Sequence, residues 1–166
     1  MGIRSEHRFS WWHQGVLLFD DDYAWSTDRV ECSEASSAAW LGQSRSGGAT
    51  YVSPGGAIFG SDDAPLTVEV AEAAPAGEPA AESVGEFDLR LSSGRLVLEV
   101  SGDEGQRTII KLPVGDWRAR WSGFGEAAAE AVAHEQRRDD STRPDRYLLQ
   151  LWPRGSRHGV VITRGQ

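Results

Sequence analysis

The chain has 166 residues, of which 39% are hydrophobic and 25% charged, and its formal net charge is −8 at pH 7. This length is typical of one domain, and the composition is that of a folded protein, which argues against wholesale disorder. The negative charge disfavours nucleic acid as a direct partner, because phosphate binding needs a cationic surface, and it favours a basic partner protein.

No apolar run reaches the length of a membrane span, and the first residues, MGIRSEHRFSWWHQG, lack the continuous apolar core of a secretory signal. We therefore expect a cytoplasmic protein with no membrane partner. The single cysteine, Cys32, excludes an intramolecular disulfide and a cysteine-based metal cage.

The first predicted strand runs from Phe9 to Phe19, where one face is almost entirely apolar and carries His13 in its middle. An enzyme could use this histidine with a carboxylate. A histidine on an apolar face is more often a packed ring with a satisfied hydrogen bond, and no serine or cysteine stands in an activated-nucleophile motif. We therefore interpret His13 as structural and expect neither catalytic residues nor a cofactor.

Further strands are predicted where apolar and polar residues alternate. In GDWRARW, Trp117 and Trp121 oppose arginines and are predicted to be core residues. The segment DRYLLQLW is apolar on both faces apart from Gln150, as expected of a central strand. The predicted strands are LTVEVA (66–71), EFDLRL (86–91), RLVLEV (95–100), QRTIIKLP (106–113), GDWRARW (115–121), DRYLLQLW (145–152) and HGVVIT (158–163).

Eight or nine short strands with Gly/Pro-rich turns predict an all-β fold, a single antiparallel β-sandwich domain over residues 1–166. A short inserted helix is predicted near 126–138, because this segment is rich in alanine and glutamate and places its charges favourably for the helix dipole. Three segments are expected to be flexible: 26–50, read as a loop, the Pro/Ala linker 74–83, and 126–143.

Acidic residues cluster in Asp20, Asp21 and Asp22 and again in Asp62 and Asp63. Such clusters are usually solvated turns. Calcium binding is a second interpretation, but the loops lack D-x-D-x-D-G spacing, and we predict no metal site. The third interpretation is an acidic surface that steers a basic partner.

Seven tryptophans are many for a chain of this length. Trp12 and Trp152 fall on the strand faces opposite the predicted core, where exposed aromatic rings can anchor a protein interface or stack on sugars. A carbohydrate- or small-ligand-binding module is therefore an alternative to a protein-binding one.

The order of several motifs resembles the bacterial competence protein J family. These motifs are SWWHQGVLLFD, GGAIFG, PLTVEVAEA, EFDLRLSSGRLVLEV, KLPVGDWRARW and DRYLLQLW, and they span roughly Phe9 to Trp152. The most specific points are the His13–Gln14 pair and the L-P-x-G-D-aromatic turn at residues 112–117. The alanine-rich segment 126–140, the linker 74–83 and the tail after Trp152 depart from the pattern.

The founding member of that family is a small acidic inhibitor of the DNA-entry nuclease. The resemblance therefore implies a non-enzymatic nuclease inhibitor or immunity-type protein that binds a basic partner. In this hypothesis the five aspartates face the cationic cleft of the partner, Trp12 or Trp152 anchors the interface, and His13 and Gln14 are internal.

Overall fold

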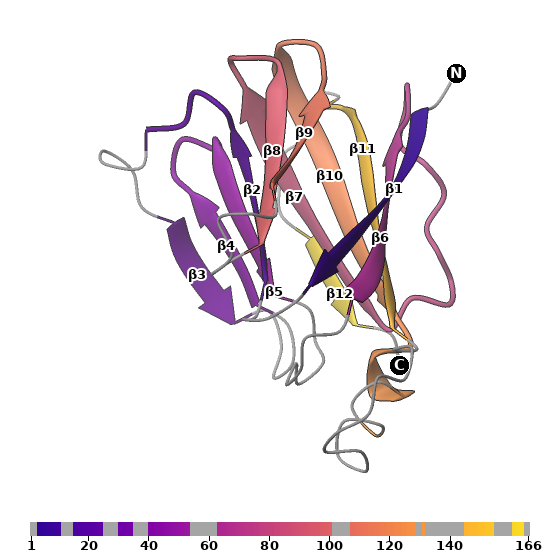
Figure 1. Cartoon of the computed structure of the whole chain (residues 1–166). Helices are drawn as coiled ribbons and strands as arrows, with labels where there is room; N and C mark the ends of the chain where they lie inside the picture. Colours follow the sequence, from indigo (N-terminus) through magenta and orange to yellow (C-terminus); the bar gives the residue numbers. More distant parts are fainter. Residues whose placement is uncertain are drawn as a thin grey trace.

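The structure is a computed structural model that describes residues 3–10, 15–24, 30–34, 40–53, 63–100, 107–128, 131, 145–154 and 161–164. Within these residues, twelve strands form two six-stranded sheets that pack face to face (Figure 1). This is the all-β sandwich that the sequence predicts, although with more strands than the eight or nine expected.

The first sheet, sheet A, has the strand order β1-β6-β11-β10-β7-β12. Its strands pair antiparallel except β11 and β6, which are parallel. The strands of sheet A are β1 (Ile3–Ser10), β6 (Asp63–Val70), β7 (Ser83–Leu91), β10 (Gly115–Phe124), β11 (Arg146–Pro153) and β12 (Val161–Arg164).

The second sheet, sheet B, has the order β3-β4-β5-β2-β8-β9, and all of its strand pairs are antiparallel. The strands of sheet B are β2 (Val16–Asp20), β3 (Val30–Glu34), β4 (Trp40–Ser44), β5 (Ala49–Ser53), β8 (Arg95–Val100) and β9 (Arg107–Lys111). Two of the crossings between the sheets, from β7 to β8 and from β9 to β10, are short turns that lie at the same end of the sandwich (Figure 1).

The core lies between the two sheets and is built by the strand faces that the sequence predicts to be apolar. Burying these side chains stabilises the sandwich by removing apolar surface from water. The central position predicted for the segment 145–152 is also confirmed, since β11 lies between β6 and β10 and is buried from Tyr147 to Trp152. The predicted core residues that are buried are Leu66, Val68, Phe87, Leu89, Leu91, Leu96, Leu98, Val100, Trp117, Ala119 and Trp121.

Two sequence-based expectations about the N-terminal half are wrong. The stretch Phe9 to Phe19 is not one strand, because β1 ends at Ser10 in sheet A and β2 begins at Val16 in sheet B. The alternating pattern of the sequence continues through residues 11–14, so it does not mark the point where the chain passes from sheet A to sheet B. The supposed loop 26–50 contains β3, β4 and the start of β5, because cross-strand pairing outweighs the weak strand preference of Ser, Ala and Gly.

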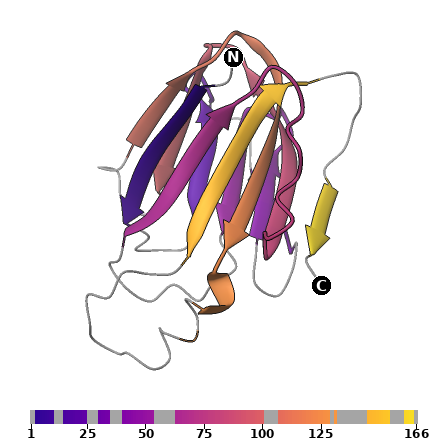
Figure 2. The ribbon, with the colours of Figure 1, turned by 90° about the vertical axis from the view of Figure 1, so that its right-hand side faces the viewer.

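The linker between β6 and β7 runs down the outer face of sheet A (Figure 2). The Arg120 guanidinium donates hydrogen bonds of 3.1 and 3.3 Å to the carbonyl oxygens of Pro75 and Ala76, which hold the linker on the sheet. Residues 126–128 and 131 are helical, and the remainder of the predicted helix lies outside the described residues. None of the helical segments in the described part of the chain is long and apolar enough to span a membrane.

Candidate functional site: a polar groove at one end of the sandwich

Four loops meet at the end of the sandwich where the chain crosses between the sheets, and backbone hydrogen bonds connect them. The Asp20 N–H donates to the Gly48 carbonyl at 2.8 Å, and the Arg90 N–H donates to the Gly47 carbonyl at 2.9 Å. The Leu112 N–H donates to the Gly94 carbonyl at 3.0 Å. The turns of the two sheets therefore form one hydrogen-bonded unit.

The L-P-x-G-D-aromatic motif of the sequence is the β9–β10 turn of this unit. Leu112 is buried in the core, and the Trp117 indole N–H donates to the Pro113 carbonyl at 2.9 Å. Gly115 has φ of +146°, a conformation that L side chains rarely adopt. In the adjoining β7–β8 turn, Gly94 has φ of +70°, and a Cβ there would lie 2.9 Å from the Leu112 carbonyl oxygen.

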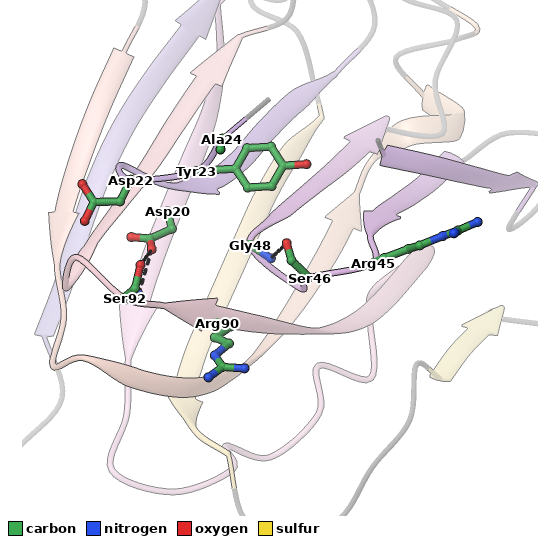
Figure 3. A pocket seen from close by; sticks show the side chains of 9 residues that line it. All are labelled: Asp20, Asp22, Tyr23, Ala24, Arg45, Ser46, Gly48, Arg90 and Ser92. Carbon is green, nitrogen blue, oxygen red and sulfur yellow. Dashed lines mark hydrogen bonds between the residues drawn. The ribbon is translucent and has the colours of Figure 1, made fainter. Parts of the chain in front are cut away.

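A polar groove lies at this end of the molecule, and Figure 3 shows the residues that line the larger of its two hollows. It consists of two adjoining hollows of about 600 and 290 Å³, which share Arg45, Ser46 and Arg90. Its lining offers guanidinium, carboxylate, hydroxyl and phenol groups, a set suited to binding a polar ligand by hydrogen bonds and charge. The lining residues are Asp20, Asp22, Tyr23, Ala24, Gln43, Ser44, Arg45, Ser46, Gly47, Gly48, Asp88, Leu89, Arg90, Ser92, Asp116 and Arg154.

Asp20, which the sequence analysis assigns to partner binding, is a structural residue. It is only 3% exposed. Its carboxylate accepts backbone N–H bonds from Ser92 at 2.7 Å and Ser93 at 3.1 Å, and hydroxyl bonds from both serines. Burial opposes ionisation, but these hydrogen bonds outweigh it and hold the pKa of Asp20 below its ordinary value. The carboxylate fixes the β7–β8 turn and is not available to a partner.

Asp21 is also held by internal contacts, whereas Asp22 is not. Asp21 forms ion pairs with Arg95 at 3.2 Å and Arg107 at 2.6 Å, and the Arg107 guanidinium also lies 5.6 Å from the centre of the Phe19 ring. Asp22 is exposed and makes no hydrogen bond or ion pair within the described ranges. Among the described residues, Asp22 is thus the member of this acidic triad whose carboxylate lies at the groove without an internal partner.

Trp152 was expected to be exposed, and this prediction is wrong. Its side chain is 7% exposed, and the Arg120 guanidinium lies 5.3 Å from the centre of its ring. It lies on the outer face of sheet A beneath the Arg120 guanidinium, so the strand alternation identifies its face but not its burial. Trp12, His13, Gln14 and Asp62 lie outside the described residues, as does the side chain of Asp63, although its backbone begins β6.

The ion pairs of the arginines in sheet A were not predicted from the sequence. In the register of β7 and β10, Glu86 lies opposite Arg120 and Asp88 lies opposite Arg118. Both pairs form ion pairs, with N–O distances of 2.7 and 2.9 Å. Arg118 also reaches Glu86 at 3.2 Å. The signal was present as charges of opposite sign at alternate positions of EFDLR and DWRAR, which oppose each other in an antiparallel pair.

The same register places Arg90 opposite Asp116, at the groove end of β7 and β10. Both side chains are exposed, and this third pair of opposite charges does not form an ion pair in the described structure. Arg90 instead lines both hollows of the groove.

A scan against protein-family models finds no match, and no curated protein matches the sequence. The solved structures similar to this chain include ComJ from Bacillus subtilis, the inhibitor of the DNA degrading activity of NucA, at 10% identity and a TM-score of 0.58. The fold resembles that of ComJ. The protein of crocagin biosynthetic gene J is similar at 15% identity with the same TM-score, and each match covers 92% of this chain and 98% of the other. The resemblance to the competence protein J family is thus confirmed at the level of the fold.

Proposed function

We propose that this chain is a non-enzymatic, protein-binding inhibitor of a nuclease, which acts by docking on its partner in a bacterial cytoplasm. The observation that carries the proposal is the likeness to ComJ, because it extends over 92% of this chain and 98% of that inhibitor. An inhibitor of this kind works through a preformed surface and needs no catalytic residues of its own.

The net charge of −8 supports a basic partner. A nuclease binds a polyanion, so its cleft is expected to be cationic, and opposite charges across an interface accelerate association. The described acidic residues best placed for this role are Asp22 and Asp116, both exposed at the groove. Asp20 and Asp21 are held by internal contacts and contribute to the shape of this surface.

The carbohydrate-binding alternative has less support in the described part of the chain. It needs exposed tryptophans, whereas Trp117, Trp121 and Trp152 are all buried. The described groove is lined instead by charged and hydroxyl groups, which favours a polar protein partner.

The test is to capture the partner from the native host and to titrate the chain into the captured protein while DNA degradation is measured. We expect activity to fall linearly and to end near one chain per nuclease. A captured partner without nuclease activity, or one whose activity persists at a large excess of the chain, would refute the proposal.

A charge variant sharpens this test. Asp22→Asn is expected to slow association severalfold and to reduce its dependence on salt, because an exposed interfacial charge acts mainly on the on-rate. Glu78→Gln is the matched control, since Glu78 is exposed in the linker, away from the groove. Equal association rates for both variants would exclude Asp22 from the interface.

A further inference from the structure

Arg90 lies opposite Asp116 in the strand register of sheet A but forms no ion pair with it. Two of the three cross-strand charge pairs of β7 and β10 form ion pairs, and the third, Arg90 and Asp116, does not. The Arg90 side chain is exposed, has no ion pair within the described residues, and lines both hollows of the groove. Figure 3 shows it with the other residues that line the larger hollow. Its five N–H donors are therefore available to a bound group.

The backbone that carries Arg90 is held from both sheets. The described part of β12 pairs with β7 from Ser83 to Glu86, and the β4–β5 hairpin contacts β7 further along, at Asp88 and Arg90. There the Gln43 side-chain amide donates to the Asp88 carbonyl and the Arg90 N–H donates to the Gly47 carbonyl. On the other side, Asp20 fixes the β7–β8 turn. A guanidinium on such a rigid base loses less entropy when it binds.

The chemistry of Arg90 selects an oxyanion, because a guanidinium binds carboxylate and phosphate groups with two parallel hydrogen bonds. The surrounding charges select between the two. The groove is lined by four carboxylates (Asp20, Asp22, Asp88 and Asp116) and three guanidinium groups (Arg45, Arg90 and Arg154), and this excess of negative charge repels a phosphate dianion more strongly than a singly charged carboxylate. Of these carboxylates, Asp22 and Asp116 are exposed. The same carboxylates can pair with basic side chains beside the bound group.

We propose that this groove receives a carboxylate group of the protein partner, that Arg90 binds it, and that Asp22 and Asp116 pair with basic side chains around it. The identity of the partner rests on the function proposed above, whereas the affinity of the groove for a carboxylate does not. This chain would then contribute both a positive group, Arg90, and negative groups, Asp22 and Asp116, to the interface. The specificity for the partner would depend on this arrangement of charges and not only on the excess of acidic residues.

The first test uses the chain alone. Arginine Nε–Hε signals are followed by NMR during titration with sodium acetate, sodium phosphate or sodium chloride at constant ionic strength. The Arg90 signal is expected to shift saturably with acetate, less with phosphate and not with chloride. A stronger response to phosphate would overturn the choice of a carboxylate, and no saturable shift with either oxyanion would overturn the site.

The second test uses the captured nuclease. Arg90→Gln is expected to weaken inhibition about 10- to 100-fold, the usual effect of losing a charge-assisted hydrogen bond at an interface. Lys111→Gln is the matched control, because Lys111 is exposed at the end of β9 but does not line the groove, and it should leave inhibition unchanged. Equal inhibition by both variants would refute the role of Arg90.

The two tests separate the two proposals. A saturable acetate response in a chain that inhibits no nuclease would refute the proposed function and leave the groove as a carboxylate site. Inhibition that Arg90→Gln does not weaken, together with no acetate response, would refute the groove and leave the proposed function in place.

Discussion

The outer face of sheet A and the groove use the same two strands in different ways. On the outer face, the charges of β7 and β10 are paired, as in Glu86–Arg120 and Asp88–Arg118. One pair further along, at the groove, Arg90 and Asp116 lie opposite each other and remain unpaired in the described structure. The sheet register offers all three pairs, so the difference lies in their surroundings.

The paired charges belong to a polar row that crosses most of sheet A. It runs from Arg4 through Glu69, Gln150 and Arg120 to Glu86, with contacts of 3.2, 3.1, 3.5 and 2.7 Å. In this row, neighbouring side chains supply one another's hydrogen-bond and ion-pair partners. Gln150, in the middle of the row, is 2% exposed. Charges of this kind stabilise the register of the sheet, whereas the exposed charges at its end are available for recognition.

The largest effect that would test this distinction is expected at Arg118. Replacing it with alanine removes ion pairs to Glu86 and Asp88 from a side chain that is 9% exposed. We expect a loss of about 3 kcal/mol in the free energy of unfolding, because two charge-assisted hydrogen bonds and the packing of the aliphatic stem are lost, although Glu86 keeps Arg120 and Asp88 keeps Arg154. Arg90→Ala on the same strand pair should change it by less than about 0.5 kcal/mol. Chemical denaturation measures both, and equal losses would contradict the distinction.

The acidic triad provides a smaller effect of the same kind. Asp20→Asn retains one acceptor oxygen but brings an amide toward the serine N–H groups, and it should cost about 2 kcal/mol in the free energy of unfolding. Asp22→Asn should be nearly neutral, because the Asp22 carboxylate has no partner in the described residues. Thermal unfolding of the two variants would show the contrast, and a stable Asp20→Asn protein would show that the turn is held by other contacts.

The stability should also depend on pH through Asp20. Its pKa in the folded protein is lower than the ordinary value of 3.8, so its contribution is complete above that value and is lost as the pH falls through the lower pKa of the folded state. Asp20→Asn should therefore reduce the loss of stability between neutral pH and about pH 3. Denaturation curves across this range measure the slope, and an unchanged slope in the variant would contradict the assignment.

The smallest effect is expected where Arg120 holds the linker. Arg120→Lys keeps the charge but cannot reach Glu86 and the two linker carbonyls with one planar fork, so we expect a loss of about 1 kcal/mol. Limited proteolysis should cut the segment 71–82 faster in this variant than in Lys111→Gln. If cleavage is unchanged, the linker is held on the sheet without Arg120.

The sequence predicts the core better than the surface. Alternation identifies the buried faces of Phe87, Leu89 and Leu91, because burial of one face imposes a period of two. It cannot distinguish Asp20 from Asp22, since both lie in one acidic run and only the β7–β8 turn, some 70 residues later, holds one of them. The burial of Trp152 is hidden from the sequence for the same reason, because the Arg120 guanidinium over its ring comes from another strand, β10.

The groove illustrates the same limit. Arg90 is unremarkable in the sequence, and it becomes a candidate binding residue only when the register with Asp116 and the position of the β4–β5 turn are known. The opposed charges of β7 and β10 could have been found by aligning EFDLR against DWRAR in antiparallel order. The absence of an ion pair between Arg90 and Asp116 could not have been found from the sequence, because it depends on the shape of the groove.

A double-mutant cycle tests this account most directly. The free energy of unfolding is measured for the chain, for each single replacement and for the double replacement at Glu86 and Arg120, and again at Arg90 and Asp116. A coupling energy of about 1 kcal/mol is expected for Glu86 and Arg120, and one close to zero for Arg90 and Asp116. Equal coupling in the two pairs would show that Arg90 is held by the sheet like its neighbours, and the groove would lose its candidate binding residue.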